Sequence, residues 1–175
     1  SLQLAAQMKN RGDLYAFDID PRRLEELKIR ARRDSVHNVR IHILPNVPDL
    51  AGKADRVLVD APCTGTGTLR RCPDIKWRTI DLERLVSTQR AILAAAATLV
   101  KPGGRLVYAT CSILPEENEA IVAGFLAAHP DFKQVSAQEI LAQQGIALAC
   151  GEALRLAPHT HGTDGFFAAV LERAV

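Results

Sequence analysis

Two short apolar runs each lead into a cysteine, and two thiols in one site are suited to covalent chemistry on a substrate. Residues 57–67 read VLVDAPCTGTG and contain Cys63, and residues 106–112 read LVYATCS and contain Cys111. Apolar, β-branched runs bounded by turn residues are typical of buried parallel strands. In open α/β sheets, active sites lie at the carboxyl ends of such strands. We therefore expect the two thiols to share one site.

The motif around Cys63 combines an acid, a proline and a glycine-rich loop. At the end of a strand, Asp60 can hydrogen-bond a polar group of a substrate or cofactor, and Pro62 fixes the backbone direction before the thiol. Residues 64–67, TGTG, allow a backbone to approach a ligand closely. An isolated free cysteine is more often a small buried hydrophobe, but these neighbours favour a functional Cys63.

Cys111 is the stronger candidate for a nucleophile. It directly follows a strand-like run, and Pro115 with two glutamates begins a helical pattern a few residues later. A cysteine beside the N-terminus of a helix is stabilised as a thiolate. Cys72 and Cys150 lie in a loop and near the end of an alanine-rich segment, and we expect both to be structural.

A zinc site is the alternative use of these cysteines. His159 and His161 have a metal-compatible spacing and would join Cys63 and Cys111 as ligands. The cysteines themselves contain no compact ligand pair, so we expect no metal.

The composition is that of one ordinary soluble domain. The chain has 175 residues, of which 47% are hydrophobic and 24% charged. No apolar stretch is long enough to span a bilayer, and the first residues lack a signal-peptide pattern. Four cysteines without CxxC pairing indicate free thiols in a reducing compartment. These features predict a cytoplasmic protein without a membrane partner.

Positive charge is concentrated in the first half of the chain. Residues 1–90 carry 17 Lys and Arg against 12 Asp and Glu, whereas residues 91–175 carry 5 against 8. The basic residues cluster in residues 22–40 and 70–90. Part of this pattern is explained by basic residues on solvent-exposed helix faces. The more specific alternative is a surface that binds the phosphates of a nucleic acid. Aromatic residues, at 5%, are too few for the base-stacking sheet of an RRM or OB domain.

Alternating strand and helix patterns predict a doubly wound, mostly parallel α/β sheet. Helical patterns occupy residues 2–9, 80–100 and 115–128, another helix opens at Asp20 and Pro21, and a short one is headed by Ser136. Strands are expected at residues 14–18, 39–44, 56–60, 105–110, 132–135 and 165–173. The last follows a long irregular stretch, and we expect it to run antiparallel.

Asp18 ends the first expected strand. In nucleotide-binding α/β folds an acid at such a position accepts hydrogen bonds from a ribose diol. The alternative is a helix cap, because Asp20 and Pro21 follow as an N-cap residue and a first-turn proline.

Three segments together carry a resemblance to a known family. DAPCTGTGTLRRCPDIKW, YATCSILPEENEAIV and HGTDGFFAAVLER closely resemble, in this order, three motif blocks of the Sun/Nop family of S-adenosylmethionine-dependent RNA (cytosine-5) methyltransferases. The similarity is greatest to the bacterial Sun (Fmu) branch, which modifies small-subunit ribosomal RNA, and it covers residues 18–173. It implies a Rossmann-like class I methyltransferase fold.

The resemblance also assigns roles to the site residues. Cys111 matches the thiolate that adds to carbon 6 of cytosine, which turns the ring into an enamine able to attack a methyl sulfonium. Asp60 matches the acid that holds the cytosine edge near the methionine end of the cofactor. Cys63 matches the residue that assists breakdown of the covalent adduct.

Cofactor and RNA contacts follow from the same comparison. For S-adenosylmethionine the matching positions are Asp18 at the ribose, Ile19 along the adenosine, and Asp60 with Pro62; Asn46 is a weak substitute for the family's adenine-binding acid. The target base must leave its stack to react. The basic residues expected to hold the ribosomal RNA beside it are Arg70, Arg71, Lys76 and Arg78.

The chain departs from the family at its start. The family's first strand and glycine-rich loop should lie before Ser1, so residues 1–175 resemble an N-terminally truncated catalytic domain whose sheet lacks its first strand. A non-catalytic fragment or a degenerate RNA-binding domain of the same fold is the alternative. A nicotinamide dehydrogenase that uses Asp18 for ribose would leave both cysteine motifs unexplained.

Overall fold

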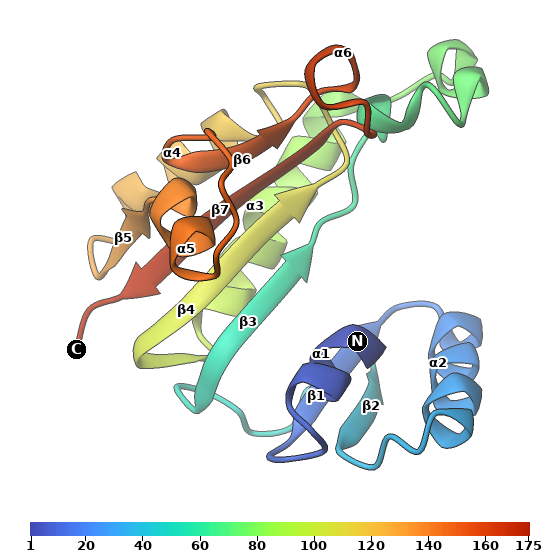
Figure 1. Cartoon of the computed structure of the whole chain (residues 1–175), viewed down its shortest axis with the longest axis vertical. Coiled ribbons are helices and arrows are strands. Elements are labelled where there is room, and N and C mark those ends of the chain that lie inside the picture. The colour runs from blue at the N-terminus through green and yellow to red at the C-terminus, as the bar shows by residue number, and fades with distance from the viewer. The chain divides into compact units, whose positions relative to one another are not determined.

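A computed structural model describes residues 1–175 and divides them into two compact units, Ser1–Leu50 and Ala51–Val175 (Figure 1). None of the helices combines the length and the apolar character that a membrane crossing requires. The two units are described separately below.

Unit 1 is a βαβ arrangement with one additional short helix. Its elements are α1 (Leu2–Gln7), β1 (Leu14–Asp18), α2 (Pro21–Arg33) and β2 (Val39–Ile43). The strands β1 and β2 pair in parallel, with Asp18 opposite Ile43. The Asp20 side chain caps α2 by accepting a 2.9 Å hydrogen bond from the Arg22 backbone N–H, and Pro21 occupies the first turn. The N-cap of α2 is therefore Asp20 and not Asp18, which is the last residue of β1.

Unit 2 is built on a five-stranded sheet. Its strands are β3 (Ala54–Asp60), β4 (Val100–Thr110), β5 (Phe132–Val135), β6 (Ala153–Leu156) and β7 (Phe166–Arg173). The order is β3-β4-β7-β5, and β6 pairs with the same edge of β7 as β5 does. The strands β3 and β4 are parallel, and β7 runs antiparallel to its neighbours. This arrangement confirms the α/β fold and the antiparallel final strand.

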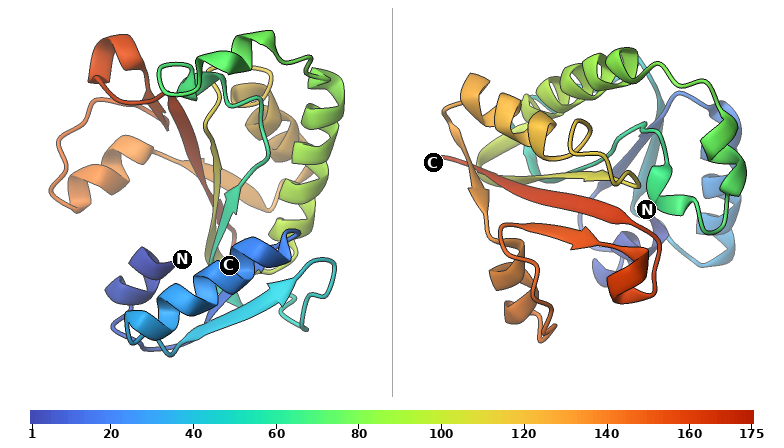
Figure 2. Two further views of the ribbon diagram at one scale, coloured as in Figure 1. Left: turned by 90° about the vertical axis from the view of Figure 1, so that its right-hand side faces the viewer. Right: turned by 90° about the horizontal axis from the view of Figure 1, so that it is seen from above.

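Helices cover both faces of the unit 2 sheet. The long helix α3 (Leu82–Ala97) and α4 (Glu119–Ala128) pack on one face, and α5 (Ala137–Gln143) lies on the other (Figure 2). Two short 3-10 helices, η1 (Thr66–Thr68) and η2 (Pro73–Trp77), follow β3, and α6 (Pro158–His161) precedes β7. The fully buried core includes one or more side chains from each main layer: Leu93, Leu106, Tyr108, Ile121 and Leu171.

The structure differs from the sequence-based predictions in several places. The helix expected to reach Val100 ends at Ala97, because Val100 is fully buried and starts β4 opposite Ala54. The helix expected from Pro115 begins only at Glu119, after a turn. The stretch expected to be irregular before β7 contains the short elements β6 and α6.

Two glycines bring the loops at the carboxyl end of the sheet together. The Gly67 backbone N–H donates to the Cys111 carbonyl at 2.9 Å, and the Gly165 N–H donates to the Gly67 carbonyl at 2.8 Å. A Cβ added to Gly67 would lie 2.1 Å from the Gly165 oxygen and 2.8 Å from the Cys111 oxygen. Only glycine at position 67 permits this approach of the loops that follow β3 and β4.

We expect Gly67→Ala to lower the free energy of unfolding of unit 2 by about 2 kcal/mol or more, because both obstacles are backbone atoms that cannot rotate away. Gly124→Ala is the matched control, since Gly124 is exposed within α4 and an added Cβ meets nothing within 4 Å. That variant should be unchanged or more stable by about 0.5–1 kcal/mol. Urea unfolding followed by circular dichroism makes the comparison, and equal effects of the two changes would contradict the packing argument.

Candidate active site

The structure brings Cys63 and Cys111 together at the carboxyl ends of β3 and β4. Asp60, the last residue of β3, is opposite Ala109 in the parallel register, so the two cysteines follow adjacent strand ends. Their Sγ atoms lie 3.4 Å apart, and either can donate to the other. Both side chains are half-buried. A substrate atom that approaches one thiol therefore lies within reach of the other.

The environment of Cys63 disfavours its thiolate. Burial raises the pKa of the Cys63 thiol to about 12, and the hydrogen bond with Cys111 acts in the same direction. A backbone N–H at Gly65 opposes the shift only in part. Cys63 therefore keeps its proton at neutral pH, which suits a group that exchanges a proton and does not suit a resting nucleophile.

Glu117 connects the segments that carry the two thiols. Its Oε1 accepts hydrogen bonds from the Thr64 backbone N–H and from Gln89 Nε2, both at 2.9 Å, and its Oε2 accepts from the Thr64 hydroxyl at 2.6 Å. Glu117 is fully buried. Thr64 directly follows Cys63, and Glu117 lies in the turn that follows Cys111. The carboxyl group thus fixes the position of one loop relative to the other.

Further hydrogen bonds complete this buried network. Gln89, from α3, also donates to the Pro62 carbonyl at 2.8 Å. The Thr66 and Ser112 hydroxyl oxygens lie 3.1 Å apart, and the Ile113 N–H donates to Thr66 Oγ1 at 3.1 Å. Most of these buried polar groups find a partner, whereas Gln89 Oε1 is buried without one. The backbone on both sides of Cys63 is held in this way.

Sequence reasoning missed Glu117 and Gln89. Glu117 was assigned to the first turn of a helix, but α4 starts two residues later, at Glu119, and leaves the Glu117 side chain free to turn inward. Gln89 lies among the apolar residues of α3 and is fully buried. An amide in an otherwise apolar stripe is the signal that could have identified it, because a buried amide requires partners.

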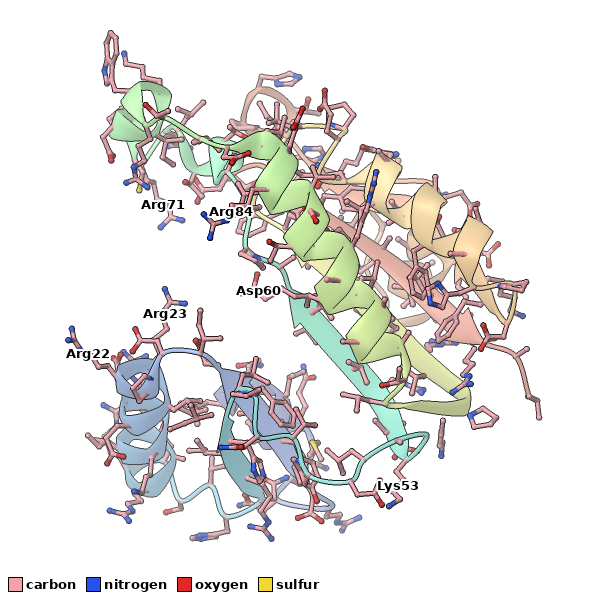
Figure 3. All side chains as sticks on the ribbon, turned by 180° about the vertical axis from the view of Figure 1, so that it is seen from behind. Arg22, Arg23, Lys53, Asp60, Arg71 and Arg84 are labelled. Carbon is pink, nitrogen blue, oxygen red and sulfur yellow. The ribbon has the colours of Figure 1, made fainter.

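The residues expected at the ribose and adenosine lie in unit 1. Asp18 ends β1, and its Oδ1 accepts a 2.9 Å hydrogen bond from the Asp20 N–H. Its Oδ2 lies 3.8 Å from Nη1 of Arg23, which is labelled in Figure 3. Ile19 is 78% exposed. Asn46 is exposed in a turn, where its N–H donates to the Ile43 carbonyl at 3.0 Å. The other two expected cofactor contacts, Asp60 and Pro62, belong to unit 2.

The four basic residues expected at the RNA lie after β3 and have partners within the chain. Arg70 Nη1 donates to the Gly162 carbonyl at 2.9 Å, and Arg71 Nε donates to Asp164 at 2.6 Å. Arg78 pairs with Asp74, and the Lys76 ammonium lies 5.2 Å from the Trp77 ring centroid. Figure 3 shows Arg71 and Arg84 beyond the end of β3 that carries Asp60. Two of the four cations, Arg71 and Arg78, are therefore paired with carboxylates of the chain itself.

Comparisons with known proteins agree with this arrangement. A family model described as 16S rRNA methyltransferase RsmB/F matches residues 2–172. The probable ribosomal RNA small subunit methyltransferase B of Synechocystis sp. is 37% identical over 98% of this chain and 40% of its own length. The ribosomal RNA small subunit methyltransferase B of Pectobacterium atrosepticum is 40% identical over 92% of this chain and 37% of its own length. The chain thus spans about 40% of the length of these relatives.

A solved structure shares the fold. The crystal structure of NSun6 from Pyrococcus horikoshii with SFG superposes with a TM-score of 0.79 at 32% sequence identity, and the match covers 99% of this chain and 44% of that one. The class I methyltransferase fold expected from the sequence is thereby confirmed.

We expect Glu117→Ala to lower the free energy of unfolding by about 3 kcal/mol, because it leaves the Thr64 N–H buried without an acceptor and removes one of the two acceptors of the Gln89 amide. Glu117→Gln should cost less, since its amide oxygen still accepts and the Thr64 hydroxyl can reverse its role. Exposed Glu116 provides the control, and Glu116→Ala should change stability by less than about 0.5 kcal/mol. Equal denaturation midpoints for the two alanine variants would show that the network does not stabilise the fold.

The raised pKa of Cys63 predicts slow alkylation. Burial and the raised pKa both slow the reaction of Cys63, so exposed Cys72 should react with iodoacetamide about a hundredfold or more faster at about pH 8.5. The rate at Cys63 should still rise above pH 10, where an ordinary thiol has levelled off. Peptide mass spectrometry measures both rates, and in denaturant the difference should vanish. A Cys63 rate that levels off near pH 9 in the folded protein would contradict the assignment.

Proposed function

Because this chain belongs to the 16S rRNA methyltransferase RsmB/F family, we propose that it transfers a methyl group from S-adenosylmethionine to carbon 5 of a cytosine in ribosomal RNA through a covalent adduct on Cys111. The observation that carries the proposal is the 3.4 Å separation of the Cys111 and Cys63 sulfurs at adjacent strand ends. A single nucleophile would not need a second thiol at this distance. Formation of an adduct needs a sulfur that bonds to the base, and its breakdown needs a group that moves a proton.

Cys111 and Cys63 divide the reaction between them. The Cys111 thiolate forms a bond to carbon 6 of the cytosine, and the electron pair of the ring double bond becomes available at carbon 5. S-adenosylmethionine supplies the electrophilic methyl group. Loss of the proton from carbon 5 then restores the double bond and expels Cys111. Cys63, which keeps its proton at rest and hydrogen-bonds Cys111, is placed to assist this last step: it gives its proton to the departing Cys111 sulfur and takes the proton from carbon 5.

The family and the solved relative support S-adenosylmethionine as the cofactor. The residues present fit parts of it. Asp18 offers a partly exposed carboxyl group at the end of β1, which suits a ribose diol, and exposed Ile19 offers an apolar surface to the adenosine. Asp60 is exposed at the end of β3 and is assigned to the methionine end and the cytosine edge, with Pro62 beside it. Asn46 is assigned to the adenine.

RNA is the macromolecular substrate that the site suits. The target cytosine must be extruded from its stack to reach a thiol between two strand ends. Residues 69–78 carry Arg70, Arg71, Lys76 and Arg78 against a single acid, Asp74. These four side chains are assigned to phosphates near the extruded base.

A non-catalytic RNA-binding piece of the same fold is the second candidate. It is favoured by the share of its relatives that this chain spans, about 40%. Asp60, Cys63 and Cys111 are all retained, which favours catalysis. Methyl transfer by the isolated chain decides between the two candidates.

We expect Cys111→Ala to lower transfer of labelled methyl groups from S-adenosylmethionine to unmodified small-subunit ribosomal RNA by about 1,000-fold or more, because the nucleophile is lost. Cys63→Ala should slow turnover and make a protein–RNA adduct accumulate on denaturing gels. Cys72→Ser should behave as the unaltered chain does. Activity that survives in Cys111→Ala would refute its assignment as nucleophile, and an inactive unaltered chain would favour the non-catalytic candidate.

A further inference from the structure

A single tryptophan stands out on the basic segment next to the candidate active site. Trp77 ends η2 and is 81% exposed, although it is the only tryptophan in the chain. A side chain with so large an apolar surface is usually buried at least in part. No packing role within unit 2 accounts for its position, so a partner outside the chain is the natural explanation.

The backbone that carries Trp77 is firmly anchored beside the Cys63 loop. Ile75, two residues earlier, is buried, and a Cβ added to Gly65 would lie 3.4 Å from its Cδ1 atom. The Arg78 N–H donates to the Ile75 carbonyl at 3.1 Å. Gly65 belongs to the TGTG loop directly after Cys63. Trp77 is therefore presented to solvent by a turn that packs on the site.

The charges around Trp77 match a polyanion. Four of the ten residues 69–78 are basic and one is acidic. The Lys76 ammonium lies 5.2 Å from the Trp77 ring centroid, which places a cation over one face of the ring. With 81% of the residue exposed, the opposite face is open to a ligand.

We propose that Trp77 stacks on an unpaired base of the RNA beside the extruded target nucleotide, while Lys76 meets a neighbouring phosphate. The inference rests on the proposed function and adds a stacking contact to it. Extruding a base leaves its neighbours without a stacking partner, and an indole ring replaces that contact regardless of sequence. A flat aromatic surface flanked by cations is the combination that single-stranded RNA recognises.

A protein partner fits these surroundings less well. Cores of protein interfaces are depleted of charged residues and need contiguous apolar area. Within residues 69–78 the only other exposed large apolar side chain is Leu69. One ring with the Lys76 ammonium over one face is too small for such a core, whereas stacking requires a single ring.

The ring itself provides the direct test, because it is the only tryptophan in the 175-residue chain. Fluorescein-labelled single-stranded RNA with the small-subunit ribosomal sequence is titrated at low salt, with anisotropy to report binding and unlabelled RNA to report tryptophan emission. The proposal predicts that indole emission is quenched with the same midpoint as the anisotropy change. Binding without quenching would overturn the stacking contact and leave RNA binding intact.

Variants separate stacking from charge. Trp77→Ala should weaken RNA binding about tenfold without changing its salt dependence, and Trp77→Phe should retain most of the affinity. Lys76→Ala should instead reduce the slope of log affinity against log salt by about 0.7–0.9. Circular dichroism should show all three variants folded, since both side chains are exposed. Unchanged affinity in Trp77→Ala would overturn the inference, and an unaltered chain that does not bind RNA would overturn the proposed function along with it.

Discussion

The candidate site depends on one buried carboxyl group. Glu117 accepts hydrogen bonds from the Thr64 backbone, the Thr64 hydroxyl and the Gln89 amide, so it joins the loop after β3, the turn after β4 and helix α3. The Tyr108 hydroxyl, from the centre of β4, donates to the Glu117 carbonyl at 2.7 Å. A carboxyl group in this position is stable only while all its donors remain in place. The two thiols are thus held by a rigid framework that belongs to neither of their loops alone.

This framework explains why the surroundings of Cys63 disfavour its thiolate. The backbone on both sides of Cys63 is fixed through Thr64 and the Pro62 carbonyl, which keeps the thiol partly buried and its pKa high. Burial and the charge of Glu117 likewise raise the pKa of the Tyr108 hydroxyl, so that it remains a hydrogen-bond donor. Gly67, in the loop that contains Cys63, also packs closely against Gly165, which directly precedes β7.

Much of the fold was predictable because its signals are local. Apolar runs gave the strands β1, β3, β5 and β7 to within about two residues, and Asp20 with Pro21 gave the start of α2. The proximity of Cys63 and Cys111 followed from two parallel strands ending at one edge. These inferences needed only residue types and spacing along the chain.

The remaining features depend on contacts between distant residues. The inward turn of Glu117 is set by Thr64 and Gln89, which lie 53 and 28 residues away along the sequence. Val100 joins β4 because of a partner at Ala54, although the residues that follow it resemble the end of a helix. The basic residues were identified by charge, but their partners Gly162, Asp164 and Asp74 were not. Long-range hydrogen bonds leave little trace in local sequence patterns.

The central claim is that Cys111, and not its neighbour, bonds to the cytosine. Ribosomal RNA with 5-fluorocytidine at the target position would trap that bond after methyl transfer, because carbon 5 then lacks the proton whose loss releases the enzyme. Trypsin cleaves after Arg56, Arg70 and Arg105, which separates Cys63 from Cys111. Mass spectrometry of the trapped complex should find the nucleotide on the peptide that contains Cys111. Attachment to the Cys63 peptide would contradict the account.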